Sequence, residues 1–233
     1  MEEVFHRTIH SFVVRSGRIT RLQQHALEEY APLYCIPFDP EHKLDFEAIF
    51  HNSNPTVLEI GFGDGEATHQ MAERNPEVNY VAMDVYPPGV GALLAAVHGK
   101  GLSNVRIIHH DAAEVVETMV ADDSAGGFHI FFPDPWQKKR HNKRRLLNSS
   151  FVSVLADKLK EGGYIYCATD WEDYAFQMQD VLRGEKRLCS PFKAFVEKPD
   201  SIVPWRPQTK FERKGLDAGR VIYESYFIKR GAI

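Results

Sequence analysis

The chain has 233 residues and a formal net charge of -4 at pH 7, with 43% hydrophobic and 26% charged residues. This length favours one large α/β domain over two separate domains, and the composition is ordinary for a soluble globular protein. No apolar run reaches the roughly 20 residues that span a bilayer, and the first ten residues lack the pattern of a signal peptide. The mildly acidic balance argues against wholesale coating of nucleic acid but allows a local basic patch.

The cysteines and histidines give no sign of a disulfide framework or a metal site. Cys35, Cys167 and Cys189 show no CxxC spacing, and the 11 histidines stand without partners at metal-ligand spacing. We therefore expect reduced thiols, no bound metal and a cytoplasmic location.

Along the chain, residues 1–54 predict a partly mobile N-terminal extension, because they are polar, mixed in charge and interrupted by prolines. Residues 55–233 show a regular pattern and predict the main domain. Short apolar runs predict strands at 56–60, 80–84, 105–109, 128–132, 164–169, 191–197 and 220–228. Helical periodicity predicts helices at 66–74, 90–98, 112–120, 143–159 and 173–182. The alternation predicts an α/β fold with a mostly parallel, doubly wound sheet, in which ligands bind beyond the carboxyl ends of the strands.

The first expected strand ends in a glycine-rich loop, LEIGFGDGEAT. Gly61 and Gly63 allow a tight turn and close approach to a ligand. A dinucleotide fingerprint would need glycine at position 66, where this chain has Glu66. Asp64 would repel a pyrophosphate, and Glu59 adds a second carboxylate, so the loop favours a cationic or zwitterionic ligand such as S-adenosylmethionine. A glycine-rich turn without a ligand is the alternative.

Two further carboxylates follow the next two strands. Asp84 lies about 20 residues beyond the glycine loop, where an acidic side chain accepts hydrogen bonds from ribose hydroxyls. Asp111 follows the third strand and could hold the adenine amine, or it could serve only as the N-cap of the next helix. Acidic residues at successive strand ends are typical of an S-adenosylmethionine site.

The fourth expected strand runs directly into Pro133-Asp134-Pro135-Trp136. The prolines fix the backbone around Asp134 beside the expected methyl-donor pocket, and Trp136 offers a flat face. The order of residues differs from the (Asn/Asp)-Pro-Pro-(Tyr/Phe) element of enzymes that methylate exocyclic amines on bases. A rigid turn that caps the next helix is the alternative interpretation.

A dense basic cluster follows this turn: six of the eight residues 138–145 are Lys or Arg, and none is acidic. Such side chains neutralise phosphates, and arginine can do so through two hydrogen bonds. The cluster therefore predicts contact with a nucleic acid beside the expected methyl-donor pocket, although basic runs are often solvated helix faces.

The chain resembles the bacterial single-subunit tRNA (guanine-N7)-methyltransferases over nearly its whole length. The similar strings are SFVVRSGRIT, VLEIGFGDGEAT, YPPGVGALL, NVRIIHHDAAE, IFFPDPWQKKRHNKRRLL, YIYCATDWEDYA and TKFERKGLDAG. The resemblance implies a Rossmann-like methyltransferase fold with an antiparallel C-terminal strand and S-adenosylmethionine as cofactor. It implies methylation of guanine N7 in the variable region of tRNA by a monomer or homodimer, with no membrane and no obligate protein partner.

The resemblance also implies roles for individual residues. Those that contact or adjoin the cofactor are Glu59, Gly61, Gly63, Asp84, Asp111 and Asp134, and Asp134 is also the catalytic residue. Those tied to the substrate are Lys138, Asp170, Thr209, Lys210, Phe211 and Glu212. Those that contact RNA are Arg140, His141, Asn142, Lys143, Arg144 and Arg145. One departure is Asp84-Val85-Tyr86, where the family usually has Glu-Val-His; the shorter Asp could still reach a ribose, but Tyr86 leaves the His without a counterpart.

The chemistry of guanine N7 limits what these side chains must do. N7 has a free lone pair and no proton, so no general base is required, and we expect Asp134 to act by positioning and electrostatics. Asp170 and Glu212 are candidates to bind the N1 and N2 hydrogens of guanine, or they pair with Arg213 or a neighbouring lysine. Trp136 is either a stacking partner for the base or part of the core.

Three other functions compete with this one. They are methylation of an exocyclic amine, a non-catalytic RNA-binding subunit and a nicotinamide oxidoreductase, and Glu66 disfavours the last. In the N-terminal extension, Arg7, Arg15, Arg18 and Arg21 predict an arm that closes over RNA or cofactor, or one that is only solvated.

Overall fold

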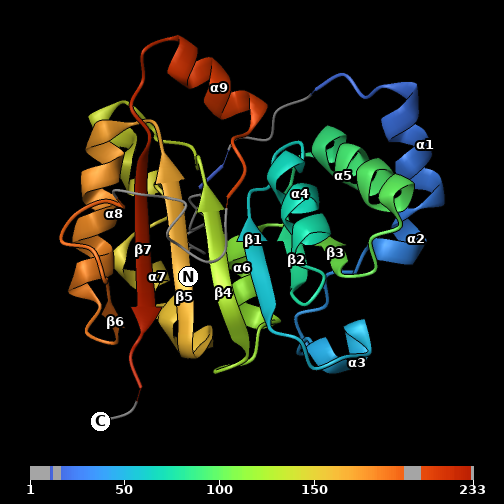
Figure 1. The fold of residues 1–233 in the computed structure, drawn as a ribbon, viewed down its shortest axis with the longest axis horizontal. Coiled ribbons are helices and arrows are strands. Elements are labelled where there is room, and N and C mark those ends of the chain that lie inside the picture. The colour runs from blue at the N-terminus through green and yellow to red at the C-terminus, as the bar shows by residue number, and fades with distance from the viewer. Residues whose placement is uncertain (1–10, 13–16, 197–205, 232–233) are drawn as a thin grey trace, which may run out of the picture.

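A computed structural model describes residues 11–12, 17–196 and 206–231 (Figure 1). The strands are β1 (Thr56–Ile60), β2 (Asn79–Met83), β3 (Val105–Ile108), β4 (Ala125–Phe131), β5 (Leu159–Thr169), β6 (Leu188–Cys189) and β7 (Tyr223–Lys229). The helices are α1 (Arg21–Glu29), α2 (Ala31–Tyr34), α3 (Phe46–Phe50), α4 (Glu66–Arg74), α5 (Pro87–Lys100), α6 (Ala112–Thr118), α7 (Ser149–Lys158), α8 (Glu172–Gly184) and α9 (Lys210–Asp217), with the 3-10 helix η1 (Lys139–Arg144). None of these helices is long and apolar enough to cross a membrane.

The strands form one sheet in the order β3-β2-β1-β4-β5-β7-β6. Strands β1 to β5 are parallel to one another, and β7 runs antiparallel to both β5 and β6 (Figure 1). This arrangement confirms the expected α/β fold with an antiparallel C-terminal strand. It also brings the carboxyl ends of β1 to β4 to a single edge.

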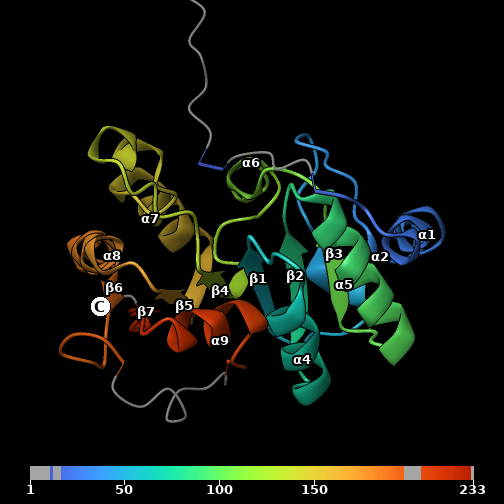
Figure 2. The ribbon, with the colours of Figure 1, turned by 90° about the horizontal axis from the view of Figure 1, so that it is seen from above.

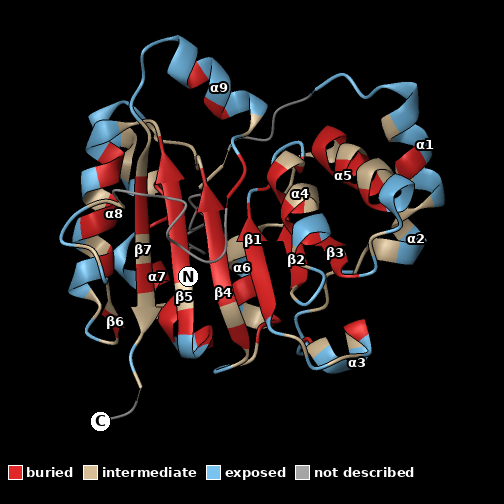
Figure 3. Ribbon diagram, in the orientation of Figure 1, coloured by how far each residue is buried: buried red, intermediate tan, exposed pale blue. Residues whose placement is uncertain are grey.

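Helices cover both faces of the sheet and divide the core in two (Figure 2). On one face α6, α7 and α8 pack residues such as Val116, Leu155 and Met178 against Leu58 and Phe128. On the other face α4 and α5 pack Met71, Leu93 and Val97 against residues of β1 to β3. The central strands are therefore buried along most of their length (Figure 3), as apolar strands of a doubly wound sheet should be.

Two predicted elements differ from the structure by more than their bounds. The helix expected at 143–159 is split into η1 and α7, because Asn148 is the N-cap of α7: its side chain accepts a hydrogen bond from the Phe151 N–H over 3.1 Å. The strand expected at 191–197 is wrong over its described residues 191–196, because residues 191–195 form bends and Val196 lies in no regular element. Pro191 lacks an N–H donor, and β6 ends before it at Cys189.

The described part of the N-terminal extension packs on the main domain. Helix α1 lies along α5, where Ala26 is fully buried. The Ile36 N–H donates to the Ile107 carbonyl over 2.9 Å, and Cys35 forms a parallel bridge to Ile107, so this segment continues the sheet beside β3.

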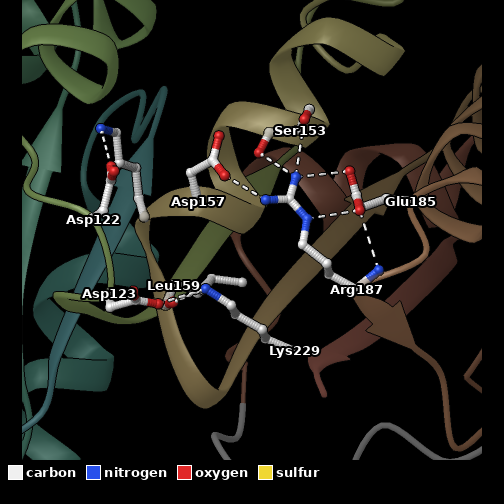
Figure 4. Close-up of polar contacts among 9 residues, drawn as sticks. Asp122, Asp123, Ser153, Asp157, Leu159, Glu185, Arg187 and Lys229 are labelled. Atoms are coloured by element: carbon white, nitrogen blue, oxygen red, sulfur yellow. Dashed lines mark hydrogen bonds and ion pairs between the residues drawn. The ribbon is translucent and has the colours of Figure 1, made fainter. Parts of the chain in front are cut away.

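A polar network ties β6 and β7 to α7 at the edge of the sheet opposite the glycine loop (Figure 4). Arg187 pairs with Asp157 and Glu185, and its guanidinium donates to the Ser153 hydroxyl over 2.9 Å. Lys229 pairs with Asp123 over 2.6 Å. These pairs fasten the antiparallel strands to the parallel part of the sheet.

Candidate active site

Four predicted carboxylates lie at or just beyond the carboxyl ends of four neighbouring strands. Glu59 lies in β1, Asp84 follows β2, Asp111 follows β3 and Asp134 follows β4. Since these strands are adjacent and parallel in the order β3-β2-β1-β4, the fold gathers the four side chains along one edge of the sheet. In doubly wound sheets this edge is the ligand-binding edge.

The glycine loop after β1 is open on its outer side. Gly61 and Gly63 have φ angles of 75° and 59°, and a Cβ built on either meets no atom within 4 Å. Side chains rarely adopt these angles, so the chain needs glycine at both positions. The Gly63 N–H donates to one Asp84 oxygen over 2.8 Å, and the Tyr86 N–H donates to the other over 3.0 Å. Asp84 thus holds the loop in place.

Glu59 is a buried carboxylate beneath this loop. Its side chain accepts a hydrogen bond from the Thr68 hydroxyl over 2.6 Å, and the residue is 2% exposed. Burial raises the pKa of Glu59 to about 7, with the Thr68 hydrogen bond lowering it and the Asp84 charge raising it. Burial also raises the pKa of Asp84, against the lowering effect of the backbone hydrogen bonds from Gly63 and Tyr86.

The charge of this region fits a cationic ligand. Among the described residues, no Lys or Arg pairs with Glu59 or Asp84. Two carboxylates that lack a cationic partner are costly to bury together, and a bound positive charge would offset that cost. The open glycine loop and these carboxylates therefore fit the sulfonium and ammonium groups of S-adenosylmethionine.

Asp111 is the N-cap of α6, as one of its two interpretations predicted. Its side chain accepts a hydrogen bond from the Ala113 N–H over 3.0 Å. The side chain is half-buried at the same edge as Asp84. Its capping role does not test contact with adenine, which stays a prediction.

The turn that contains Asp134 is framed by two residues in the left-handed region. Phe132 has a φ of 53° and Trp136 a φ of 47°, which aromatic residues rarely adopt. The Phe132 N–H is fixed to the Ala168 carbonyl over 2.7 Å. Strained backbone of this kind is concentrated at functional sites, and here it fixes the half-buried Asp134 beside the end of β4.

Trp136 serves as a platform for Arg144. The Arg144 guanidinium lies 3.9 Å from the centre of the Trp136 ring, and the edge of His141 contacts the same ring. The indole N–H donates to the Ser11 carbonyl over 2.8 Å. One face of the indole is therefore covered by an arginine in a fixed orientation.

Arg145 lies inside the protein, unlike the rest of the basic cluster. It is 2% exposed, and its guanidinium donates to the Pro135 carbonyl (2.8 Å), to Gln177 (2.5 Å) and to Asp173 (2.6 Å). The ring of Tyr174 lies 4.8 Å below it. These contacts tie the Asp134 turn to α8. Arg145 therefore binds groups within the protein, whereas the sequence predicted a contact with phosphate.

The remaining basic residues lie on or near η1, with their charges toward solvent. Lys138, Arg140 and Lys143 are exposed, while His141 and Asn142 are half-buried. Partial burial and the surrounding positive charges lower the pKa of His141. The exposed residues form a positive surface beside the Asp134 turn. Of the N-terminal arginines, Arg18 and Arg21 are exposed, and Arg7 and Arg15 lie outside the described residues.

The segment Thr209–Glu212 opens α9 above the same edge (Figure 1). The Thr209 hydroxyl is the N-cap and accepts a hydrogen bond from the Glu212 N–H over 3.2 Å. Phe211 is 53% exposed, and its ring lies 5.2 Å from the ring of Phe132. The Lys210 side chain is exposed and its backbone N–H contacts Glu66.

Glu212 and Asp170 are both engaged in ion pairs, with partners other than those named from the sequence. Glu212 is 6% exposed and makes two hydrogen bonds to Arg206, of 2.5 and 2.9 Å. Asp170 accepts from Arg220 over 2.5 Å. Any contact of these carboxylates with guanine must share or displace these arginines.

The network around Arg206 was not predicted from the sequence. This arginine also pairs with Glu224 of β7, and Glu224 accepts a hydrogen bond from the Tyr166 hydroxyl. The signal that could have found it is a single acidic residue within the apolar run RVIYESYFI. A buried carboxylate in a strand requires a partner, and Arg206 supplies one from a segment 18 residues earlier.

Comparison with known proteins identifies the family. Residues 53–225 match the family model described as "Putative methyltransferase". The chain is 50% identical over 229 residues to a tRNA (guanine-N(7)-)-methyltransferase of Cupriavidus necator, with 97% of this chain and 85% of that protein covered. The chain belongs to the tRNA (guanine-N(7)-)-methyltransferase family. A protein of that name from Paraburkholderia xenovorans is 47% identical over 232 residues, covering 99% of this chain and 87% of its own.

Solved structures support the fold of this family member. A 16S rRNA methyltransferase, KamB, superposes with a TM-score of 0.56 at 18% identity, covering 80% of this chain and 93% of its own. A 16S rRNA (adenine(1408)-N(1))-methyltransferase from Catenulisporales acidiphilia gives 0.56 at 15% identity, with 83% and 92% covered. At these identities the likeness extends to the methyltransferase fold alone.

Proposed function

We propose that this protein transfers a methyl group from S-adenosylmethionine to N7 of a guanine in the variable region of tRNA, forming 7-methylguanosine. The observation that carries the proposal is the place of Asp134. It lies between the acidic glycine-loop site of β1 and β2 and the exposed basic residues of η1. Family membership, with relatives near 50% identity over almost the whole chain, supplies the reaction.

The acidic edge of the sheet is the cofactor side of this site. S-adenosylmethionine supplies a methyl group on a positively charged sulfur, which a nucleophile attacks directly. Glu59 and Asp84 would hold its positive charge and ribose, and Gly61 and Gly63 let the backbone approach it. Asp111 would contact the adenine while it caps α6.

On the acceptor side the residues need only orient the base. Because N7 has a free lone pair, the rate depends on alignment of N7 with the methyl group and on exclusion of water. Asp134 would orient the guanine through its N1 or N2 hydrogens and stabilise the positive charge that develops on the purine. Its rigid turn between Phe132 and Trp136 suits a positioning role.

The basic surface and α9 would hold the RNA. Lys138, Arg140, Lys143 and Arg144 would neutralise phosphates, and Trp136 fixes the orientation of Arg144. The target base must leave its contacts in the folded tRNA, at a cost of roughly a few kcal/mol. The exposed ring of Phe211, next to Phe132, offers a face on which the freed base can stack. Thr209 and Lys210 flank that ring.

The test is transfer of labelled methyl from S-adenosylmethionine to unmodified tRNA, with the modified atom mapped by cleavage specific for 7-methylguanine. Wild type should label N7, and Asp134→Ala should abolish labelling while it still binds tRNA. Label on an exocyclic amine, or no label with intact RNA binding, would each refute the proposal in favour of one of the competing functions.

The remaining expectations concern the setting of this reaction. We propose that the enzyme works in the cytoplasm as a monomer or homodimer and needs no second protein for activity. Methyl transfer by the purified chain alone tests whether a second protein is needed, and the mass of the protein in solution tests its oligomeric state.

A further inference from the structure

The residue that breaks the dinucleotide fingerprint has a specific set of contacts. Glu66 is the first residue of α4, directly after the glycine loop. One of its carboxylate oxygens accepts a hydrogen bond from the Lys210 N–H over 2.5 Å, and the other pairs with the Arg213 guanidinium over 3.0 Å. Both partners belong to α9, more than 140 residues later in the chain.

These contacts are a substantial part of what holds α9. Only Glu212 and Gly215 are buried in this helix, which lies above the carboxyl ends of the strands (Figures 1 and 2). The first turn also has the Glu212–Arg206 pair and the Phe211–Phe132 ring contact. Within the same segment, the Glu212 N–H donates to the Thr209 hydroxyl and the Arg213 guanidinium donates to the Gln208 carbonyl. A helix with so little buried apolar surface depends on individual polar contacts for its position.

Helix α4 has no side-chain cap at its own N-terminus. The N-cap of α4 is Gly65, which has no side chain to accept a hydrogen bond. A glutamate at this position could point along its own first turn, where helices favour negative charge. Its carboxylate instead lies at the first N–H of α9.

We propose that Glu66 is a positioning residue that pins α9 to the glycine loop and thereby holds the substrate segment Thr209–Glu212 at a fixed distance from the cofactor side. The inference rests on the proposed function, because it takes residues 209–212 as the segment that binds the substrate. It assigns Glu66 no contact with either ligand. Glu66 acts through Lys210 and Arg213.

The charge of Glu66 and its positioning role predict opposite effects on tRNA binding when Glu66 is removed. Glu66 is an anion near a surface expected to bind RNA, so its removal would strengthen tRNA binding if charge were its whole effect. If Glu66 pins α9, its removal should instead weaken productive binding, because the substrate segment is no longer held in place.

The kinetic test compares Glu66→Ala with Glu73→Ala. Glu73 lies on the same helix and forms an ion pair with Lys100 over 2.5 Å, away from α9, so it controls for the loss of an α4 carboxylate. We expect Glu66→Ala to lose about tenfold in kcat/KM for tRNA, with KM for S-adenosylmethionine and Tm close to wild type. Glu73→Ala should keep wild-type kcat/KM. Glu66→Gln keeps an acceptor for the Lys210 N–H but loses the charge that pairs with Arg213, so it should fall between wild type and Glu66→Ala.

Hydrogen exchange tests, without any substrate, whether Glu66 holds α9 in place. Amides of the 206–218 peptides should exchange about tenfold faster in Glu66→Ala than in wild type. Amides in the rest of the protein should exchange at wild-type rates. Wild-type exchange in α9, or tighter tRNA binding with no loss of kcat/KM, would overturn the inference. If wild type fails to methylate tRNA, the proposed function is wrong. Faster exchange in α9 of Glu66→Ala would still show that Glu66 holds this helix in place.

Discussion

Arg145 donates a hydrogen bond from its guanidinium Nε to the Pro135 carbonyl, one residue beyond Asp134, over 2.8 Å. The same group reaches Asp173 and Gln177 of α8. The turn that contains Asp134 is therefore fixed to a helix on one face of the sheet. The neighbouring Arg144 lies against the ring of Trp136, so two consecutive arginines of one basic cluster have different surroundings.

Replacement of Arg145 should affect catalysis more than docking. We expect Arg145→Lys, which cannot form the forked contacts to Pro135, Gln177 and Asp173, to lower kcat by more than about tenfold. KM for tRNA and its dependence on salt should stay near wild type. Steady-state kinetics at several salt concentrations measure both. The milder Asp173→Asn removes the charge of one partner but keeps a hydrogen-bond acceptor, so it should lower kcat less. A large rise in KM that vanishes at low salt would instead place Arg145 on the RNA.

Replacement of Arg144 should show the opposite pattern. Loss of one phosphate contact in Arg144→Ala should weaken tRNA binding at every sequence and reduce the slope of log K against log salt by about 1. Binding titrations at several salt concentrations measure this slope. Trp136→Leu should produce part of the same loss, because it removes the platform that orients Arg144. An unchanged slope in Arg144→Ala would show that its guanidinium does not contact phosphate.

The buried Glu59 should link stability to pH. Its pKa is raised to about 7, above that of the unfolded chain near 4.3, so the folded state without cofactor loses stability as pH rises between those values. Glu59→Gln should therefore be more stable than wild type at pH 8, by up to about 4 kcal/mol at 1.36 kcal/mol per pKa unit, and similar near pH 4. Urea unfolding at both pH values measures the difference.

The same substitution should impair cofactor binding. The affinity of wild type for S-adenosylmethionine should fall as pH drops below about 7, because a neutral Glu59 no longer offsets the positive charge of the ligand. Glu59→Gln should bind weakly at all pH values. Calorimetric titrations of both proteins at pH 6 and pH 8 test this, and a gain in stability without a loss of affinity would contradict the assigned role of Glu59.

Glu212 should contribute to stability through Arg206. Glu212→Ala leaves the buried Arg206 with Glu224 as its remaining carboxylate partner, which should cost about 3 kcal/mol of unfolding free energy. Denaturant unfolding measures this cost. Loss of activity with unchanged stability would show that Glu212 acts on the substrate and that the ion pair adds little.

The network at the opposite edge of the sheet provides a control for stability without function. Arg187→Ala removes the contacts to Asp157, Glu185 and Ser153 (Figure 4). These groups are partly exposed, so we expect a loss of only about 1 kcal/mol and wild-type methyl transfer to tRNA. A clear change in KM for tRNA would mean that this edge communicates with the site.

The sequence by itself determined the alternation of strands and helices, the loop with Gly61 and Gly63, and the carboxylates at the strand ends. These features are local: apolar runs, glycines that permit positive φ and prolines that fix the backbone act within a few residues. The helix predicted at 66–74 matches α4, and the first strand predicted at 56–60 matches β1. Parallel pairing then brings the strand ends to one edge.

Only the tertiary structure decided which charged side chains are paired within the protein and which face solvent. Arg144 and Arg145 are equivalent in the sequence, yet Arg145 is buried because α8 brings Asp173, Tyr174 and Gln177 to it. Glu66 meets Lys210 and Arg213 across more than 140 residues. Such contacts depend on how distant elements pack, and residue spacing along the chain has no information about that packing.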